Sequence, residues 1–129
     1  MNPSHKDRPM QLRRWHPLAL SVILLSACTS IPYSGNPGAV RVTHNEPVGC
    51  RFLGDATGNQ GNFFTGQYTS NSNLETGARN DLKNKAAAMG GNVVYLLTNR
   101  AGVSGGQSGQ AQTNVTLSGN IYHCPESAR

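Results

Sequence analysis

The sequence has 129 residues, a formal net charge of +5, 15 glycines and a single tryptophan, and 13% of its residues are charged. This length allows one domain, and the low charge content excludes a chain that self-repulsion keeps disordered. A mean hydropathy of −0.43 excludes a membrane protein with several spans. A basic chain of this kind would ordinarily suggest a nucleic-acid partner, so the position of its charges matters.

Residues 1–27 show the three parts of a secretory signal peptide. Four basic residues come first, an apolar run over 18–25 follows, and the small residues Ser26 and Ala27 lead into Cys28. The apolar run is about half of the roughly 20 residues that a membrane-spanning helix needs. We therefore expect residues 1–27 to be removed from the mature chain.

The segment Leu25-Ser26-Ala27-Cys28 resembles the bacterial lipobox. In lipoproteins with this motif the cysteine thiol receives a diacylglycerol, the chain is cut before the cysteine, and the new amine is acylated. Each buried methylene contributes about 0.8 kcal/mol, so two or more acyl chains anchor a protein stably. We expect acylation at Cys28; a plain secreted protein is the alternative. Thr29 stands where inner-membrane retention usually involves Asp, which implies the outer membrane.

Removal of the signal peptide changes the charge of the chain. It takes away four of the eleven basic residues and one of the six acidic residues, which leaves a net charge of +2. A charge this small, without a Lys or Arg cluster, does not suit a phosphate backbone. The expected partners are therefore a membrane, reached through the anchor, and envelope proteins, but no nucleic acid.

With Cys28 acylated, the mature chain keeps two cysteines, Cys50 and Cys124. Two free cysteines in an oxidising compartment usually pair, so we expect one disulfide. It would close a loop of about 75 residues, for which the chain-entropy estimate is about 4.5 kcal/mol. Such a bond would tie the first and last strands of the domain together.

A metal site is the alternative use of these cysteines. Together with His44 and His123 they would supply two thiolates and two imidazoles, which is suitable chemistry for zinc. His123 and Cys124 are adjacent, however, so in a strand their side chains point to opposite faces. The disulfide is the favoured prediction, and no metal is expected.

The mature chain divides into a tether and a domain. Residues 28–39 combine the acylated cysteine with a Pro-, Gly- and Ser-rich stretch, which predicts a flexible tether that reaches at most about 40 Å. Residues 40–129 form the predicted periplasmic domain. Alternation of apolar and polar residues predicts a first strand over 40–44, and a second is predicted over 48–54.

A long polar loop is predicted for residues 55–71, which are rich in Gly, Asn and Thr. It contains two adjacent aromatic residues, Phe63 and Phe64. The favoured interpretation packs both rings against the core. An exposed pair would instead mark a contact surface.

The clearest predicted element is a helix that follows this loop. Ser72 and Glu75 predict a capping box at its start, and Gly90 and Gly91 are expected to end it. Apolar residues recur every three or four positions between these points, forming one stripe: Leu74, Ala78, Leu82, Ala86 and Met89. The charged residues of the other face are assigned to solvent.

Residues 93–97 are apolar without a break, which predicts a strand buried on both faces at the centre of a sheet. A Gly/Ser/Gln-rich loop is predicted for 99–110 and a last strand for 112–124, with Gly119 as a candidate bulge. The order strand, strand, helix, strand, strand predicts an α+β domain. We expect a mostly antiparallel four-stranded sheet with one packed helix and a single disulfide.

The run Gly102-Val103-Ser104-Gly105-Gly106 matches the G-x-S-x-G nucleophile elbow. That elbow needs a strand before the serine, a helix after it and a much larger sheet. The carboxylates of the mature chain are scattered along the sequence, so no pair is set up for acid–base chemistry. We expect no enzyme, and a hydrolase that uses Ser104 is the weakest alternative.

Three segments, 50–58, 78–94 and Tyr122-His123-Cys124, resemble a family of small uncharacterised bacterial lipoproteins defined by a domain of unknown function. More distantly they are similar to the outer-membrane sensor lipoprotein of the Rcs envelope-stress phosphorelay. The resemblance covers about residues 40–124. For the sensor it implies a compact, disulfide-bonded periplasmic domain that signals by contacting other envelope proteins.

The sequence therefore predicts an outer-membrane lipoprotein whose periplasmic domain binds envelope proteins, in stress sensing or assembly. The loop 59–68 with Phe63 and Phe64 is the expected contact surface. The alternative is a metal- or small-ligand-binding domain that uses His44 and His123. No cofactor is expected.

Overall fold

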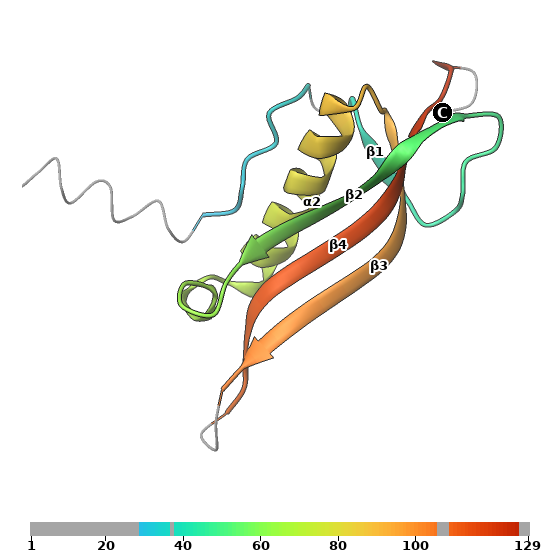
Figure 1. Ribbon diagram of the computed structural model, residues 1–129. Helices are drawn as coiled ribbons and strands as arrows, with labels where there is room; N and C mark the ends of the chain where they lie inside the picture. Colours follow the sequence, from blue (N-terminus) through green and yellow to red (C-terminus); the bar gives the residue numbers. More distant parts are fainter. Residues whose placement is uncertain (1–28, 37, 106–108, 127–129) are drawn as a thin grey trace, which may run out of the picture.

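The structure, a computed structural model, describes residues 29–36, 38–105 and 109–126. The predicted signal peptide and the predicted acylation site, Cys28, lie outside these residues. The described chain forms four strands and a long helix, with a short 3-10 helix before the long one (Figure 1). In chain order they are β1 (Arg41–Thr43), β2 (Arg51–Gly61), η2 (Gly66–Tyr68), α2 (Asn71–Ala88), β3 (Val93–Ser104) and β4 (Ala111–His123).

The four strands form one sheet in the order β1-β3-β4-β2. Strand β4 is antiparallel to both of its neighbours, whereas β1 is parallel to β3. The predicted α+β class, with a mostly antiparallel four-stranded sheet, one packed helix and a single disulfide, is confirmed. The sheet is mixed because β1 pairs in parallel with the first residues of β3. The Arg41 N–H donates to the carbonyl of Asn92, the residue just before β3 (3.0 Å).

Strands β2 and β3 are longer than predicted. Residues 55–61 and 99–104, expected as loops, continue these strands because each segment pairs with β4. Their Gly and Asn content disfavours strands when taken alone. Cross-strand pairing in the folded sheet overrides that local preference.

Three irregularities interrupt the register of the described sheet. The extra residues are Leu53 in β2 and Leu97 in β3, and a third register shift falls at Thr113 in β4. Gly119, predicted to mark a bulge, is itself paired with Ala56 and Leu96. The bulge at Leu97 lies beside it, between the pairs Leu96–Gly119 and Thr98–Ser118, so the extra residue belongs to β3 and not to β4.

Helix α2 begins earlier than predicted. Ser70 is its N-cap, and the Ser70 hydroxyl accepts a hydrogen bond from the Asn73 N–H (3.3 Å). Ser72 lies inside the first turn, so the predicted capping box with Glu75 was wrong. The tight turn before Ser70 leaves that residue extended, which makes it the last non-helical position. Gly90 follows the helix with φ of 78°, as predicted for its end.

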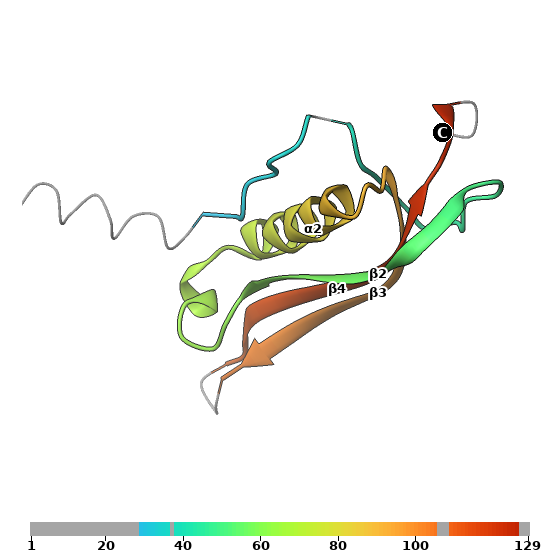
Figure 2. The ribbon, with the colours of Figure 1, turned by 45° about the horizontal axis from the view of Figure 1, so that its top comes forward.

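The core lies between α2 and one face of the sheet (Figure 2). The predicted stripe is buried at four of its five positions, and only Met89 is exposed (38%). The buried residues between the helix and the sheet form one cluster: Val40, Leu74, Ala78, Leu82, Ala86, Val94, Leu96, Val115, Leu117 and Ile121. At Gly58, β2 passes so close to α2 that a Cβ would collide with the Ala78 carbonyl.

Candidate functional site

The face of the sheet turned away from α2 is polar along most of β4. Asn114, Thr116, Ser118 and Asn120 alternate with buried core residues of this strand. Because side chains alternate across a strand, they lie on the face opposite the helix. No described element covers this face, as Figure 2 shows. We call it the open face.

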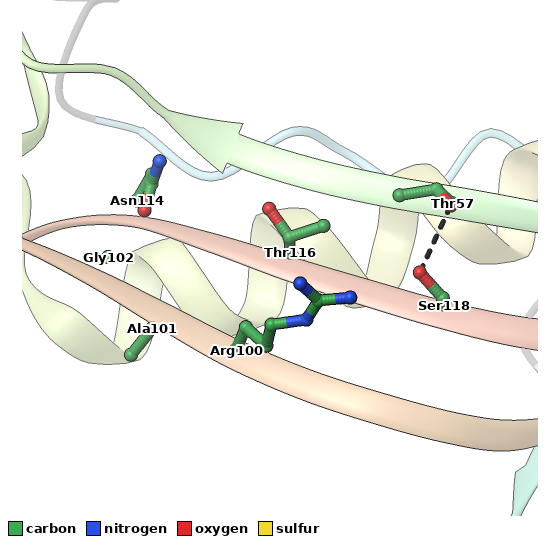
Figure 3. A pocket seen from close by; sticks show the side chains of 7 residues that line it. All are labelled: Thr57, Arg100, Ala101, Gly102, Asn114, Thr116 and Ser118. Carbon is green, nitrogen blue, oxygen red and sulfur yellow. Dashed lines mark hydrogen bonds between the residues drawn. The ribbon is translucent and has the colours of Figure 1, made fainter.

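An open hollow of about 460 Å³ lies on this face (Figure 3). Its lining comes from three adjacent strands: Thr57 of β2, Arg100, Ala101 and Gly102 of β3, and Asn114, Thr116 and Ser118 of β4. The Thr57 and Ser118 hydroxyls are 3.1 Å apart and share a hydrogen bond. The lining therefore combines hydroxyls, an amide and the guanidinium of Arg100.

The hollow is suited to recognition by hydrogen bonds. Its described lining contains no carboxylate, thiol or imidazole, so none of these groups stands there as a general base for the hydroxyls. Arg100 supplies a planar, charged donor that binds carboxylates and carbonyl groups. Hydroxyl and amide side chains both donate and accept, so the lining presents both kinds of group.

The open face is closed only at one end, where the predicted disulfide is confirmed. Cys50 and Cys124 are joined, with their Cα atoms 4.4 Å apart and a sequence separation of 74. Cys124 is buried with Val93 and Tyr122, and Cys50 packs against them. Tyr122 is two residues from Asn120 on β4 and so lies on the open face, and Val93 is paired directly with Tyr122, which places this second apolar cluster there.

Tyr122 also binds a carboxylate at this end. Its hydroxyl donates to the Glu46 Oε1 at 2.6 Å, and this hydrogen bond, followed by burial, raises the pKa of Tyr122. Phe52 packs edge-on against the same ring, with 5.5 Å between ring centroids. The contacts of Tyr122 thus connect the loop before β2 to the last strand.

The two edges of the sheet differ in how far they are blocked. On β2 the Asn59 N–H donates to Asp81 (2.9 Å) and the Thr57 carbonyl accepts from Lys85 (2.7 Å), so helix side chains occupy backbone groups. On the other side β1 pairs with β3 only over 93–95. Within the described chain, no strand pairs with the outer edge of residues 97–104, which border the hollow.

The two histidines of the alternative metal site do not meet. His44 follows β1 and His123 ends β4, and β3 lies between these strands. His123 lies 3.0 Å from the Gly90 carbonyl through Nδ1. Both sulfurs of the four-ligand set are in the disulfide, and among the residues described no group of three or more His, Cys, Asp or Glu could hold a metal.

Ser104 is the last residue of β3, and its hydroxyl lies 3.2 Å from that of Thr113. A nucleophile elbow requires a helix after the serine. The next described element is instead strand β4, which returns alongside β3. The G-x-S-x-G match is therefore a β-hairpin sequence, although its Gly106 lies outside the described residues.

Phe63 and Phe64 are exposed by 64% and 77%, so the favoured prediction that they pack into the core was wrong. Strand β2 runs on to Gly61, so the next residues leave the sheet edge in a turn instead of folding back under the helix. The helix stripe already fills the core opposite β2 and β4. The two rings contact each other edge-on, with 5.3 Å between centroids.

The predicted tether differs from expectation at residues 31–34, which lie along α2. Asn80 donates to the Ile31 carbonyl (2.8 Å) and Asn84 to the Pro32 carbonyl (3.0 Å). Asn84 also accepts from the Ser34 N–H (2.9 Å). Two asparagines one helical turn apart thus bind the backbone of this segment, which we call the N-terminal strap.

Sequence reasoning missed both the hollow and the strap. The polar half of β4 carries a usable signal, because Asn114, Thr116, Ser118 and Asn120 alternate with apolar residues. The strap has a weaker signal in Asn80 and Asn84, whose spacing puts them on one helix face. Nothing in the sequence says which segment those two side chains bind.

Among the residues that the structure describes, no helix combines the length and hydropathy needed to cross a membrane. The profile of a domain of unknown function, DUF4156, matches residues 33–124. The uncharacterized protein YjeI of Escherichia coli strain K12 is 36% identical over 107 residues, which cover 81% of this chain and 90% of that protein. The YjeI proteins of Escherichia coli O6:H1 and Shigella flexneri match to the same extent. The chain therefore belongs to the DUF4156 family.

Proposed function

We propose that this protein is an outer-membrane lipoprotein whose periplasmic domain binds another envelope protein through the open face of its sheet. One observation carries the proposal: α2 leaves uncovered a polar hollow that spans three strands. That hollow borders residues 97–104 of β3, and on the side of these residues away from β4 no described strand pairs with them. Backbone and side-chain groups for recognition are therefore exposed side by side.

The proposed location has separate support. The signal peptide and the lipobox ending at Cys28 support acylation, and acyl chains provide stable anchoring. The Cys50–Cys124 disulfide supports an oxidising compartment. The role in stress sensing or assembly belongs to the same proposal and draws on the resemblance to the sensor lipoprotein.

Strand addition is the binding mode that suits this surface. An extended peptide that pairs with a free sheet edge gains backbone hydrogen bonds, and neighbouring pockets read its alternate side chains. Residues 97–104 of β3 offer such an edge, and Arg100 of the same strand lines the hollow. We propose an extended segment of the partner along β3, with polar or acidic side chains over Arg100.

The hollow also favours a second candidate, a small polar ligand. Arg100, Asn114 and Thr116 would bind an anionic or hydroxylated compound by hydrogen bonds. This candidate retains a ligand-binding role without the predicted pair His44 and His123. It requires no protein partner and is separated from the first candidate by crosslinking.

Photo-crosslinking in intact cells tests the proposal. A photoreactive residue at Thr116, in the hollow, or at Leu97, 51% exposed on the β3 edge, should give discrete protein adducts. The same residue at Ala87, exposed on α2, is the matched control and should give none. Arg100→Glu should reduce the adducts, whereas Arg79→Glu on the helix should not.

Adducts of equal yield from all three positions would contradict a defined surface. No protein adduct from Thr116 or Leu97, together with saturable binding of a small polar compound that Arg100→Glu abolishes, would favour the second candidate.

A further inference from the structure

We infer that an exposed aromatic loop, residues 62–69, inserts into the interface of the membrane that holds the lipid anchor and so orients the domain on it. The inference rests on the proposed acylation of Cys28. Phe63, Phe64 and Tyr68 are 64%, 77% and 73% exposed and lie within six residues of one another. Aromatic side chains of this kind are suited to the boundary between lipid and water.

The loop holds its rings outward through a closed set of hydrogen bonds. The side-chain oxygen of Asn62 accepts from the Phe64 and Thr65 N–H groups (2.9 and 3.0 Å). The backbone carbonyl of Asn62 accepts from the Gly66 N–H (2.8 Å). Gly66 is buried against the Thr113 carbonyl, where a Cβ would collide. The phenylalanines are therefore presented by a braced turn that is docked on β4.

The strap brings the anchor to the same end of the molecule. The Ile31 N–H donates to the Gln60 side chain at 3.0 Å, and Gln60 is two residues before the aromatic loop. Only residues 29 and 30 separate Ile31 from Cys28, so that span is at most roughly 10 Å. Figures 1 and 2 agree that the described chain starts beside the first turns of α2, on the side of η2.

This end of the domain carries few charges. No Asp, Glu, Lys or Arg occurs between Ala56 and Leu74, or between Ala101 and Pro125. The aromatic loop and the β3–β4 hairpin can therefore approach lipid without removing an ionised side chain of their own from water, which would be costly. A neutral, aromatic end next to an acylated residue fits a lipid surface better than a charged protein surface.

The orientation agrees with the proposed binding surface. The strands run from this end to the disulfide end, and the open face lies along their length (Figure 1). With the aromatic loop at the lipid, the hollow would face sideways into the periplasm. A partner could then reach Arg100 and the β3 edge without displacing the domain from the membrane.

Depth-dependent fluorescence quenching tests the inference. The mature sequence lacks tryptophan, since Trp15 lies in the predicted signal peptide, so Phe64→Trp provides a single probe. The full acylated protein is placed in vesicles of phosphatidylethanolamine and phosphatidylglycerol with brominated acyl chains. We expect blue-shifted, strongly quenched emission. Val48→Trp, at an 87% exposed position near the disulfide, is the matched control and should stay unquenched.

A second variant tests the strap. Asn80→Ala with Asn84→Ala removes three hydrogen bonds between α2 and the backbone of Ile31, Pro32 and Ser34, so the strap is held less closely and the domain gains reach. In this background the quenching of Phe64→Trp should decrease, with unchanged circular dichroism.

The outcomes separate the inference from the function on which it rests. An acylated, vesicle-bound Phe64→Trp protein whose probe is unquenched, or is quenched no more than the probe of Val48→Trp, overturns the orientation and leaves the anchor intact. An unacylated protein that does not float with the vesicles overturns both. Crosslinks in cells from position 64 to a protein, with no quenching by lipid, would assign the loop to a protein partner instead.

Discussion

The two faces of the sheet differ in polarity and in exposure to solvent. The face under α2 is apolar and closed, and Leu74, Leu82 and Ile121 on it are fully buried. The open face has hydroxyl and amide side chains at the matching alternate positions of β4, and a hollow instead of a covering element. Burial of apolar area stabilises a fold, so one face accounts for stability and the other is free for recognition.

Among the described residues, the open face has an apolar region at the end where the Cys50–Cys124 disulfide lies. Val93, Tyr122 and Cys124 are buried there although no helix covers them. A domain of this size buries a limited share of its surface, so a covalent bond that closes this end of the open face is an effective addition. Substitutions on each face test this difference.

The largest expected effect comes from removing that covalent bond. Replacing Cys50 and Cys124 together by Ser should lower the free energy of unfolding by about 2–5 kcal/mol, because the unfolded chain gains conformational freedom. Urea denaturation monitored by circular dichroism measures this change. Reduction of the wild-type protein should reproduce it, and equal stability of oxidised and reduced protein would contradict the role of the disulfide.

The next effect contrasts the two faces directly. Leu82→Ala under the helix should destabilise by about 2–5 kcal/mol, because it leaves a cavity in a fully buried site. Thr116→Ala on the open face should change stability by about 0.5 kcal/mol or less. Similar losses for both variants in urea denaturation would show that the open face also serves stability.

The strap should have a smaller effect. Asn84→Ala removes two hydrogen bonds to the strap, which at a partly exposed site should cost about 1 kcal/mol. Hydrogen exchange at the Ser34 amide should become faster, while the amides of β4 keep their protection. Unchanged exchange at Ser34 would mean that Asn84 does not hold the strap in solution.

The smallest effect is a pH dependence at the closed end of the open face. The hydrogen bond between the Tyr122 hydroxyl and Glu46 raises the pKa of Tyr122 in the folded protein. The stability that this hydrogen bond contributes is present below the unfolded pKa of about 10 and is lost as pH rises through the folded pKa. Tyr122→Phe should remove that part of the alkaline loss of stability. Tyr68→Phe, at an exposed position, is the control and should keep it.

The sequence was sufficient where one physical signal dominated. The repeat of Leu74, Ala78, Leu82 and Ala86 predicted the buried face of α2, because a helix has only one way to bury such a stripe. Two remaining cysteines in a chain expected to be exported predicted the disulfide. The α+β class followed from the order of these elements.

Predictions failed where distant contacts decide the structure. Residues 55–61 were expected as a loop from their Gly and Asn content, but pairing with β4 makes them a strand. Phe63 and Phe64 were expected in the core because they are apolar, but the core was already filled. The hollow could not be predicted because it needs the register of three strands, which the sequence does not specify.

The central claim is that acyl chains attached to Cys28 anchor the domain to a membrane. Intact-mass analysis of the chain purified from cell membranes tests it most directly, with Cys28→Ala as the control. The account predicts a chain that starts at residue 28 and carries acyl groups, with Cys50 and Cys124 oxidised. A chain that retains Met1, lacks acyl groups and is recovered in the aqueous fraction would contradict it.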